Sequence, residues 1–214
     1  MTDAVCVKGL MKSFGERCIH DGLDFHVPKG EIVGIAGPSG SGKTTLLRIL
    51  DMIETYDEGE ISILGRPIME GRAVRRKVAM MFQKPTLFNE SLQSNVEYGM
   101  RIRGIPKKER YNRAKKALIR LGIEERAKNA HEISGGEAQR VSFAQVYVLR
   151  PGVLLLDEPS ANLDKEILKT CEQMILELKE NGTSVIIASH DDAHLQRVCG
   201  TIYMLEDGKL RKRR

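Results

Sequence analysis

The spacing of apolar residues changes along the chain. Apolar runs at Ile32–Ala36, Val153–Leu156 and Thr183–Ser189 are typical of parallel strands that are buried on both faces. Around Val5–Val7 and Leu23–Val27, apolar and polar residues alternate instead, which is typical of half-buried antiparallel strands. The pattern therefore predicts an α/β fold with a mostly parallel sheet and an N-terminal antiparallel β subdomain.

Between residues 84 and 150 the pattern changes from strands to helices. Pro106 is tolerated as a first helical residue, and Gly122 can close the helix. The apolar residues between them recur at helical spacing: Tyr111, Ala114, Leu118 and Leu121. We interpret residues 84–150 as an inserted α-helical subdomain. Residues 1–83 and 151–214 are then the core of a single domain that spans residues 1–214.

The segment Gly37–Thr45 reads GPSGSGKTT and lies between an apolar strand and a helical pattern. This is the context of a phosphate-binding P-loop. Its glycines let backbone N–H groups reach phosphate oxygens, with the positive end of a helix behind them. Lys43 can reach the β- and γ-phosphates, and the Thr44 hydroxyl can coordinate Mg²⁺. The residues predicted to bind nucleotide here are Gly37, Pro38, Ser39, Gly40, Ser41, Gly42, Lys43, Thr44 and Thr45.

Two adjacent carboxylates, Asp157 and Glu158, follow the buried run at 153–156. In a chain that carries a P-loop, this pair indicates one acid that holds Mg²⁺ and a second that orients or deprotonates water. His190 follows the run at 183–189, at the strand end where open α/β sheets bind ligands. A lone histidine is usually structural, so it is this position that makes His190 a candidate.

Composition limits the class of protein. A chain of 214 residues with 41% hydrophobic residues can bury one sizeable core, and no apolar run approaches the roughly 20 residues that cross a bilayer. Residues 1–4 lack the layout of a signal peptide. The cysteines Cys6, Cys18, Cys171 and Cys199 have no paired spacing, so we expect buried, reduced thiols rather than a zinc site or disulfides.

The net charge of +5 is compatible with nucleic acid or anionic lipid as a partner. Both signs are interspersed among the 29% of residues that are charged, however, which favours an ordinary solvated surface. The same interpretation applies to the lysines and arginines of the helix that follows Pro106. The basic end, Lys209–Arg214, is expected to be a frayed tail.

Taken together, these segments resemble the ATP-binding-cassette (ABC) ATPase family. The chain has that family's motifs in their usual order: GPSGSGKTT, Gln83, ISGGE at 133–137, LLLDEP at 154–159, SANLD at 160–164 and His190. The match covers nearly the whole chain, and six motifs in order make it specific. Further segments are similar to importer ATPases for oxyanions, most closely the tungstate type: FQKPTLF at 82–88, NVEYG at 95–99 and GGEAQR at 135–140.

The resemblance implies how the nucleotide is held at its two ends. Taken alone, Phe14 is better explained as a lid on the small core, whereas the resemblance implies an aromatic that stacks on adenine. At the other end, Ser134, Gly135, Gly136 and Glu137 would open a helix. Its N–H groups and dipole would bind an ATP held by a second subunit.

The resemblance implies that the remaining motifs catalyse the hydrolysis of ATP to ADP and phosphate. Glu158 would be the general base, and His190 would hold the γ-phosphate and stabilise charge in the transition state. Gln83 would contact Mg²⁺ and the attacking water. The residues implied in catalysis are Glu158, His190, Gln83 and Lys43, and those implied to hold Mg²⁺ are Thr44, Gln83 and Asp157.

By this resemblance the chain is the ATPase subunit of a membrane transporter, with ATP and Mg²⁺ as cofactors. Two copies would pair head to tail around two ATP, so that hydrolysis drives solute import, with an oxyanion such as tungstate as the implied solute. The chain would lie peripherally at the cytoplasmic face of the membrane. Its partners would be a transmembrane permease and, indirectly, a solute-binding protein, with no nucleic acid.

Several alternatives stay open at this point. The ATPases of lipoprotein-release or macrolide-type export systems, and importers of phosphate or amino acids, share the same motifs. A soluble cassette ATPase of DNA repair or translation usually has two cassettes or a long coiled-coil insertion, so it is less favoured. A module that binds ATP without hydrolysing it would have no need of Glu158 and His190. Gln145 departs from the family, which usually has arginine there.

Overall fold

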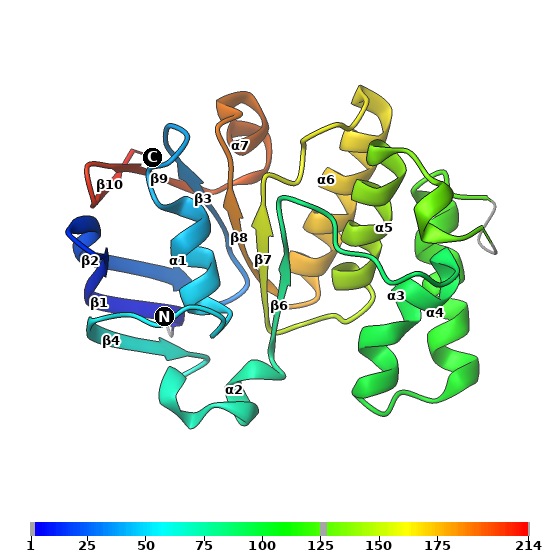
Figure 1. The fold of residues 1–214 in the computed structure, drawn as a ribbon, viewed down its shortest axis with the longest axis horizontal. Coiled ribbons are helices and arrows are strands. Elements are labelled where there is room, and N and C mark those ends of the chain that lie inside the picture. Colours follow the sequence, from blue (N-terminus) through cyan, green and yellow to red (C-terminus); the bar gives the residue numbers. More distant parts are fainter. Residues whose placement is uncertain (1–2, 125–127, 214) are drawn as a thin grey trace. The chain divides into compact units, whose positions relative to one another are not determined.

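The computed structural model describes residues 3–124 and 128–213 (Figure 1). The first two residues of the N-terminal segment and Arg214 of the basic end therefore lie outside the described residues. Within the described ranges, no helix has both the length and the apolar character needed to cross a membrane. The chain divides into two compact units: Met1–Met80 with Pro151–Glu158 and Lys179–Arg214, and Met81–Arg150 with Pro159–Leu178.

The first unit is centred on a six-stranded sheet with the strand order β10-β9-β3-β8-β7-β6. Its central strands are parallel and buried at every position: β3 (Ile32–Ala36), β8 (Ser184–Ala188) and β7 (Val153–Asp157). β9 (Thr201–Glu206) is parallel to β3, and β6 (Val78–Met81) forms one edge. Because their side chains are apolar on both faces, these strands occupy the core, and the predicted mostly parallel sheet is confirmed.

A second, antiparallel sheet is built from the N-terminal part of the chain. Its strand order is β2 (Arg17–Pro28), β1 (Asp3–Phe14), β4 (Glu58–Ile63) and β5 (Arg66–Pro67). Val5 and Val7 are buried while their neighbour Cys6 is only partly so, as the alternating pattern predicted. Phe25 of β2 packs edge-on against Tyr203 of β9 with ring centroids 5.3 Å apart, which joins the two sheets.

Helices of the first unit follow its strands: α1 (Lys43–Leu50), the short η1 (Ile68–Glu70) and α2 (Arg72–Arg75), and α7 (Asp192–Val198). α1 buries Leu46, Leu47, Ile49 and Leu50. α7 and the residue after it pack closely against β3, where a Cβ on Gly34 would lie 3.1 Å from Cys199 Sγ and 3.2 Å from Leu195. The absence of a side chain at Gly34 therefore lets α7 approach the sheet.

The second unit consists mainly of helices: α3 (Leu92–Ile102), α4 (Lys107–Arg120), the short η2 (Ala130–Glu132), α5 (Gly135–Tyr147) and most of α6 (Lys165–Glu180). Ser91 caps α3 by accepting a hydrogen bond from the Ser94 N–H. α4 begins at Lys107, so Pro106 caps the helix and is not, as the sequence had indicated, its first residue. The amide of Gln145 donates to the Asn95 carbonyl at 3.3 Å, so this departure from the family makes a contact within the helical unit.

The grouping of α6 differs from the sequence analysis, which assigned all of residues 151–214 to the core. Residues 159–178 group with the helical unit instead. Arg120 of α4 donates to both carboxylate oxygens of Glu177 at 2.7 and 2.8 Å, and the Tyr147 hydroxyl donates to the same carboxylate at 3.0 Å. These contacts join residues far apart in the sequence, so the sequence of α6 alone does not reveal with which unit the helix groups.

The basic C-terminal segment is a strand and not a frayed tail. β10 (Lys209–Lys212) pairs antiparallel with β9. The turn between them has φ angles of 48° at Asp207 and 70° at Gly208, and Asp-Gly is a preferred sequence for such a tight hairpin. Lys209 Nζ also donates to the Asp21 carbonyl at 2.7 Å. The prediction of a frayed tail was wrong because a charged segment can still pair through its backbone with the strand before the turn.

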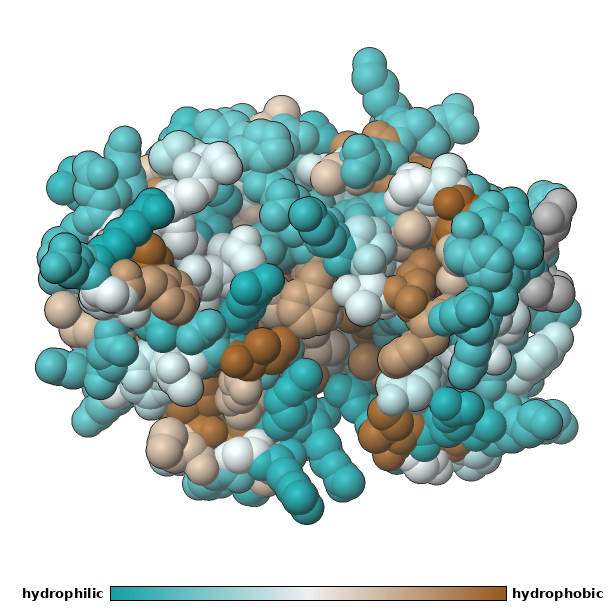
Figure 2. All heavy atoms as spheres, viewed as in Figure 1, coloured by the Kyte–Doolittle hydropathy of each residue, from teal (hydrophilic) through white to brown (hydrophobic). Residues whose placement is uncertain are grey.

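Figure 2 shows a face that is mostly hydrophilic, with hydrophobic residues in small separate groups. Cys171 and Cys199 are buried, and burial raises the pKa of each thiol to about 12. Cys6 is half-buried and Cys18 is exposed, so the expectation of buried thiols is wrong for these two.

Candidate nucleotide-binding site

The P-loop, residues 37–45, connects β3 to α1 in the first unit. Two of its glycines have no room for a side chain. A Cβ on Gly37 would lie 2.4 Å from the Leu205 carbonyl oxygen, and one on Gly42 would lie 2.8 Å from His20 Cε1. Gly42 also has a φ of 103°, which other residues rarely adopt. Glycine at these two positions therefore lets the loop lie directly against β9 and β2.

Lys43, at the start of α1, is folded back onto its own loop. Its Nζ donates to the Gly37 carbonyl at 2.7 Å and to the Pro38 carbonyl at 3.0 Å. Burial lowers the pKa of the ammonium, while the nearby charges of Glu158 and Asp157 act in the opposite direction. Because both of these partners are uncharged carbonyls, the ammonium can exchange them for phosphate oxygens at the same place.

Thr44 and Asp157 bring two oxygens together between α1 and the end of β7. The Thr44 hydroxyl donates to Asp157 Oδ2 at 2.8 Å. The other carboxylate oxygen, Oδ1, is buried and has no hydrogen-bond partner among the described residues. Burial raises the pKa of Asp157. A buried oxygen without a partner beside a hydroxyl is a donor set that suits Mg²⁺.

Glu158 is held by groups at the end of β8. Its Oε2 accepts a hydrogen bond from the Ser189 hydroxyl at 3.0 Å, and its Oε1 accepts one from the His190 N–H at 3.1 Å. The Nδ1 atom of His190 lies 2.8 Å from the same Oε1. Glu158 has a φ of 50°, a conformation that few residues other than glycine adopt. Backbone and neighbours together fix the direction of this carboxylate.

His190 and Gln83 differ in how the structure places them. The side chain of His190 is 73% exposed while its ring stays beside Glu158, so a ligand can reach it from solvent. Gln83 is exposed, follows β6 and belongs to the second unit. Its implied contacts with Mg²⁺ and water stay a prediction.

Phe14 is the last residue of β1, and its side chain is not a lid on the core. The residue is 49% exposed. Lys12 Nζ lies over the ring at 4.5 Å from its centroid. An exposed aromatic ring with a cation near its face is compatible with the stacking platform that the family resemblance implies.

Residues 134–137 open α5, as the family resemblance implied. Ser134 Oγ accepts from the Glu137 N–H at 3.2 Å, and Glu137 Oε2 accepts from the Ser134 N–H at 2.9 Å, which is a capping box. The hydrogen bond from the Ser134 N–H lowers the pKa of Glu137. A Cβ on Gly136 would lie 3.0 Å from the Asn162 carbonyl oxygen, so this glycine permits close packing within the helical unit.

Residues that sequence reasoning missed lie beside the P-loop. Arg17, Cys18 and Ile19 of β2 and residues 206–208 of the C-terminal hairpin line a cavity of about 300 Å³ together with residues 38–41. Arg17 Nη2 donates to the Gly40 carbonyl at 3.5 Å. These segments come from opposite ends of the sequence, so no local pattern shows that they meet. The Asp207-Gly208 pair was the one available signal, because it marks the hairpin that brings residue 206 to the loop.

His20 lies in β2 directly against Gly42 and is fully buried. Neither ring nitrogen makes a hydrogen bond of normal geometry to any described residue. Burial lowers the pKa of His20 from 6.5 to about 4, and the nearby Ile19 carbonyl raises it only in part. At neutral pH the His20 ring that contacts the P-loop is therefore uncharged.

We expect His20 to make the fold sensitive to mild acid. The unfolded chain binds a proton at this histidine near pH 6.5 and the folded chain only near pH 4, so stability is lost as the pH falls through this window. Between about pH 7.5 and about pH 5 the loss amounts to about 2 kcal/mol. Urea denaturation at both pH values measures the free energy of unfolding. Its decrease from the higher to the lower pH should be smaller by this amount in His20→Leu than in the wild type. Equal losses would contradict the prediction, and exposed His26→Leu is the matched control.

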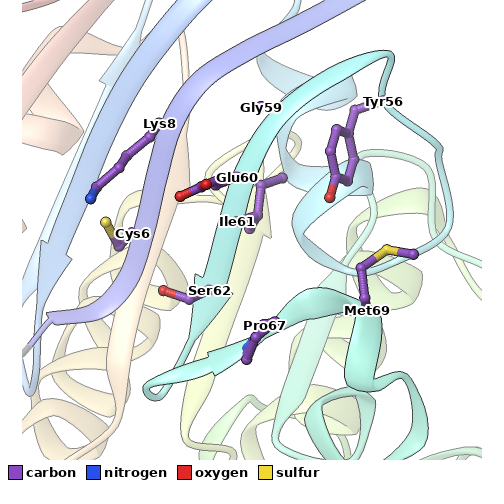
Figure 3. Close-up of a pocket in the computed structure, with 9 residues that line it drawn as sticks. All are labelled: Cys6, Lys8, Tyr56, Gly59, Glu60, Ile61, Ser62, Pro67 and Met69. Carbon is purple, nitrogen blue, oxygen red and sulfur yellow. The ribbon is translucent and has the colours of Figure 1, made fainter.

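A second cavity, of about 490 Å³, lies on the N-terminal antiparallel sheet (Figure 3). The residues that line it are Cys6, Lys8, Tyr56, Gly59, Glu60, Ile61, Ser62, Pro67 and Met69. In Figure 3 the rings and side chains of Tyr56, Pro67 and Met69 lie on one side of β4, and Lys8 and Cys6 lie on the other. None of these residues belongs to a nucleotide motif, so we assign this cavity no part in nucleotide binding.

Comparison with known proteins shows the family of this chain. A family described as "ABC transporter" matches residues 20–161, more than half of the chain. The chain is 36% identical over 208 residues to the tungstate uptake system ATP-binding protein of Peptoclostridium acidaminophilum, and the match covers 96% of both chains. It is 35% identical over 213 residues to the Fe(3+) ions import ATP-binding protein of Pasteurella multocida, covering 97% of this chain but 60% of that protein.

Among solved structures, the dimeric ATP-binding cassette MJ0796 bound to ADP and phosphate has a TM-score of 0.89 to this chain. The two are 29% identical, and the likeness covers 98% of this chain and 99% of that one. Fold, motif order and sequence relatives thus agree. The chain belongs to the ABC transporter family, in which it is an ATP-binding subunit with ATPase activity.

Proposed function

We propose that this chain hydrolyses ATP to drive a membrane importer whose solute is an oxyanion such as tungstate. The observation that supports hydrolysis, rather than nucleotide binding alone, is the fixed carboxylate at the end of β7. Glu158 is 7% exposed, and hydrogen bonds from Ser189 and His190 set its orientation. A carboxylate held in this way next to a phosphate-binding loop has the position that a general base for water requires.

In the proposed reaction, Glu158 accepts a proton from the water that attacks the γ-phosphate, and ADP and phosphate are the products. Lys43 exchanges its Gly37 and Pro38 carbonyl partners for phosphate oxygens, because a charged acceptor forms the stronger hydrogen bond. His190 donates to the γ-phosphate from its exposed ring and so stabilises the charge that develops there.

Mg²⁺ is proposed to lie between Thr44 and Asp157, with Gln83 as a further contact. The buried oxygen of Asp157 without a hydrogen-bond partner in the described part of the chain supports this site. When bound, the ion would offset the charge of the phosphates. The Thr44 hydroxyl, which donates to Asp157 in this structure, would then turn its lone pairs toward the metal.

Two copies of the chain are proposed to pair head to tail around two ATP. Ser134, Gly135 and Gly136 of one copy would face the ATP held by the P-loop of its partner, where the start of α5 offers N–H groups and a positive helix end. The dimeric assembly named for the similar cassette supports this pairing. Glu137 now occupies the Ser134 N–H and hydroxyl, so a phosphate would have to compete with this carboxylate.

Tungstate is proposed as the solute because the tungstate relative matches this chain over nearly the whole length of both proteins. The iron relative is longer than this chain but is 35% identical to it over 213 residues. An importer of another ion is therefore the alternative. As in the family, the chain would bind a transmembrane permease at the cytoplasmic face of the membrane and would meet the solute-binding protein only through that permease.

The test is recovery of the tagged chain from detergent-solubilised membranes of its own host, followed by mass identification of bound proteins. We expect a permease with several membrane spans. The solute-binding protein encoded beside it should then bind tungstate more tightly than molybdate, phosphate or sulfate. Recovery of ribosomes, DNA or no membrane protein would contradict the importer. A permease whose binding protein prefers another solute would contradict tungstate alone.

A further inference from the structure

Lys12 is a buried lysine whose partners are fixed. The residue lies in β1, two positions before Phe14, and is 4% exposed. Its Nζ lies 2.9 Å from Glu54 Oε1 and donates to the Thr55 hydroxyl at 3.5 Å. The same nitrogen lies over the Phe14 ring, 4.5 Å from the centroid. Since a buried ammonium is costly unless it is paired, these contacts define one position for the side chain.

The partner of Lys12 lies in the loop that leaves the P-loop helix. Glu54 follows α1, whose last turn is closed by the Ile53 N–H on the Arg48 carbonyl at 2.9 Å. The same loop is tied to β1 by a second contact, because the Ser13 N–H donates to Asp57 Oδ2 at 2.7 Å. The end of β1 that carries Phe14 is thus bound to the segment that follows α1, by a charged pair and a backbone contact.

Phe14 has no polar atom with which to fix its own ring. A tyrosine at this place would have a hydroxyl available for a hydrogen bond, whereas a phenylalanine is held by packing and by ring electrostatics alone. The ammonium near one face provides such a contact, because a cation within about 6 Å of the centroid is attracted by the ring quadrupole. The hydrogen bond from Lys12 lowers the pKa of Glu54, so this carboxylate is charged at neutral pH.

The exposure of Phe14 indicates what the ring is oriented for. Lys12 is near one face, yet the residue keeps 49% of its surface exposed. A large apolar ring that is held in place but left open to solvent gains nothing for the core. Its free surface suits a flat aromatic partner. When two such rings stack with an offset, the surfaces that face each other are removed from water.

We propose that Lys12, clamped by Glu54, is a positioning residue that holds Phe14 with its free face toward the adenine base of ATP. This inference rests on the proposed function, in which Phe14 stacks on adenine. It adds a residue outside the known motifs and makes a specific statement about the ligand. Lys12 should contribute to binding of the base and not to binding of the phosphates.

Calorimetric titration of Lys12→Met with Mg-ATP and with Mg-tripolyphosphate, which lacks a base, tests this statement. Methionine keeps the aliphatic volume and removes the charge. We expect the affinity for ATP to fall about threefold to tenfold, the size of a cation–π contact, and the affinity for tripolyphosphate to stay the same. The KM for ATP should rise while kcat stays within about twofold. Lys12→Arg should restore ATP affinity, because a guanidinium also interacts with an aromatic face.

The matched control is Lys8→Met, which removes an exposed lysine of the same strand and should change neither affinity. An equal loss for ATP and tripolyphosphate in Lys12→Met would show a merely structural role and overturn the proposal, as would no loss for either ligand. Phe14→Leu separates the two inferences. If Phe14→Leu leaves ATP affinity unchanged, the adenine platform of the proposed function is wrong. If Phe14→Leu weakens ATP binding and Lys12→Met does not, only the role of Lys12 is wrong.

Discussion

Replacing Glu158 with glutamine is expected to slow ATP hydrolysis at least about a hundredfold, the size of effect typical of a lost general base. Glutamine keeps the shape of the side chain but cannot accept the proton of the attacking water. The contacts from Ser189 and His190 can still orient an amide oxygen, so ATP binding and dimer formation should persist. Phosphate release measures the rate, and size-exclusion chromatography with Mg-ATP measures the dimer.

The control for this variant is Glu180→Gln, an exposed carboxylate at the end of α6 that should hydrolyse ATP at the wild-type rate. Undiminished turnover in Glu158→Gln would remove Glu158 from the role of base. Loss of ATP binding in the same variant would instead show that the carboxylate supports the structure of the site, because the rate could not then be assigned to proton transfer.

Replacing Lys43 with methionine is expected to weaken ATP binding at least about a hundredfold, because charge-assisted hydrogen bonds to phosphate contribute about 1.5–3 kcal/mol each. The variant also removes the donor that the Gly37 and Pro38 carbonyls now share. Lys43→Arg should not restore affinity, since the planar guanidinium does not fit a place shaped for a compact ammonium. Calorimetric titration with Mg-ATP measures both variants.

Lys29→Met serves as the control for Lys43, since it removes an exposed lysine from the turn between β2 and β3. A Lys43→Met affinity within about tenfold of the wild type would mean that the backbone N–H groups of the loop carry most of the binding. Thermal unfolding without nucleotide shows whether the loop stays folded, since a lower midpoint for Lys43→Met alone would indicate that its two carbonyl contacts stabilise the empty site.

The sequence predicted those parts of the molecule whose signals are local. The buried strands β3, β7 and β8 follow from continuous apolar runs, and the P-loop follows from glycines between a strand and a helix. Burial of Asp157 and Glu158 in one site follows from their place at the end of such a strand. In each case a few neighbouring residues contain all the information, which is why the fold class was correct.

What the sequence did not reveal depends on contacts between distant residues. Lys12 reads as an ordinary polar position of a strand, and only the fold shows that Glu54 lies beside it. His20 reads as one histidine among five, and only burial against Gly42 gives it an unusual pKa. The grouping of α6 depends on Arg120 and Glu177, whose pairing no periodicity predicts.

The hairpin of β9 and β10 lines a cavity with segments that are synthesised much earlier. Gly208 accepts a hydrogen bond from the Asp21 N–H at 3.0 Å, and residues 206–208 form one wall of the cavity beside the P-loop. Translation proceeds at about 5–20 residues per second, so residues 206–208 are synthesised on the order of ten seconds or more after the P-loop. A nascent chain that stops before residue 206 should therefore lack this wall of the cavity beside the P-loop.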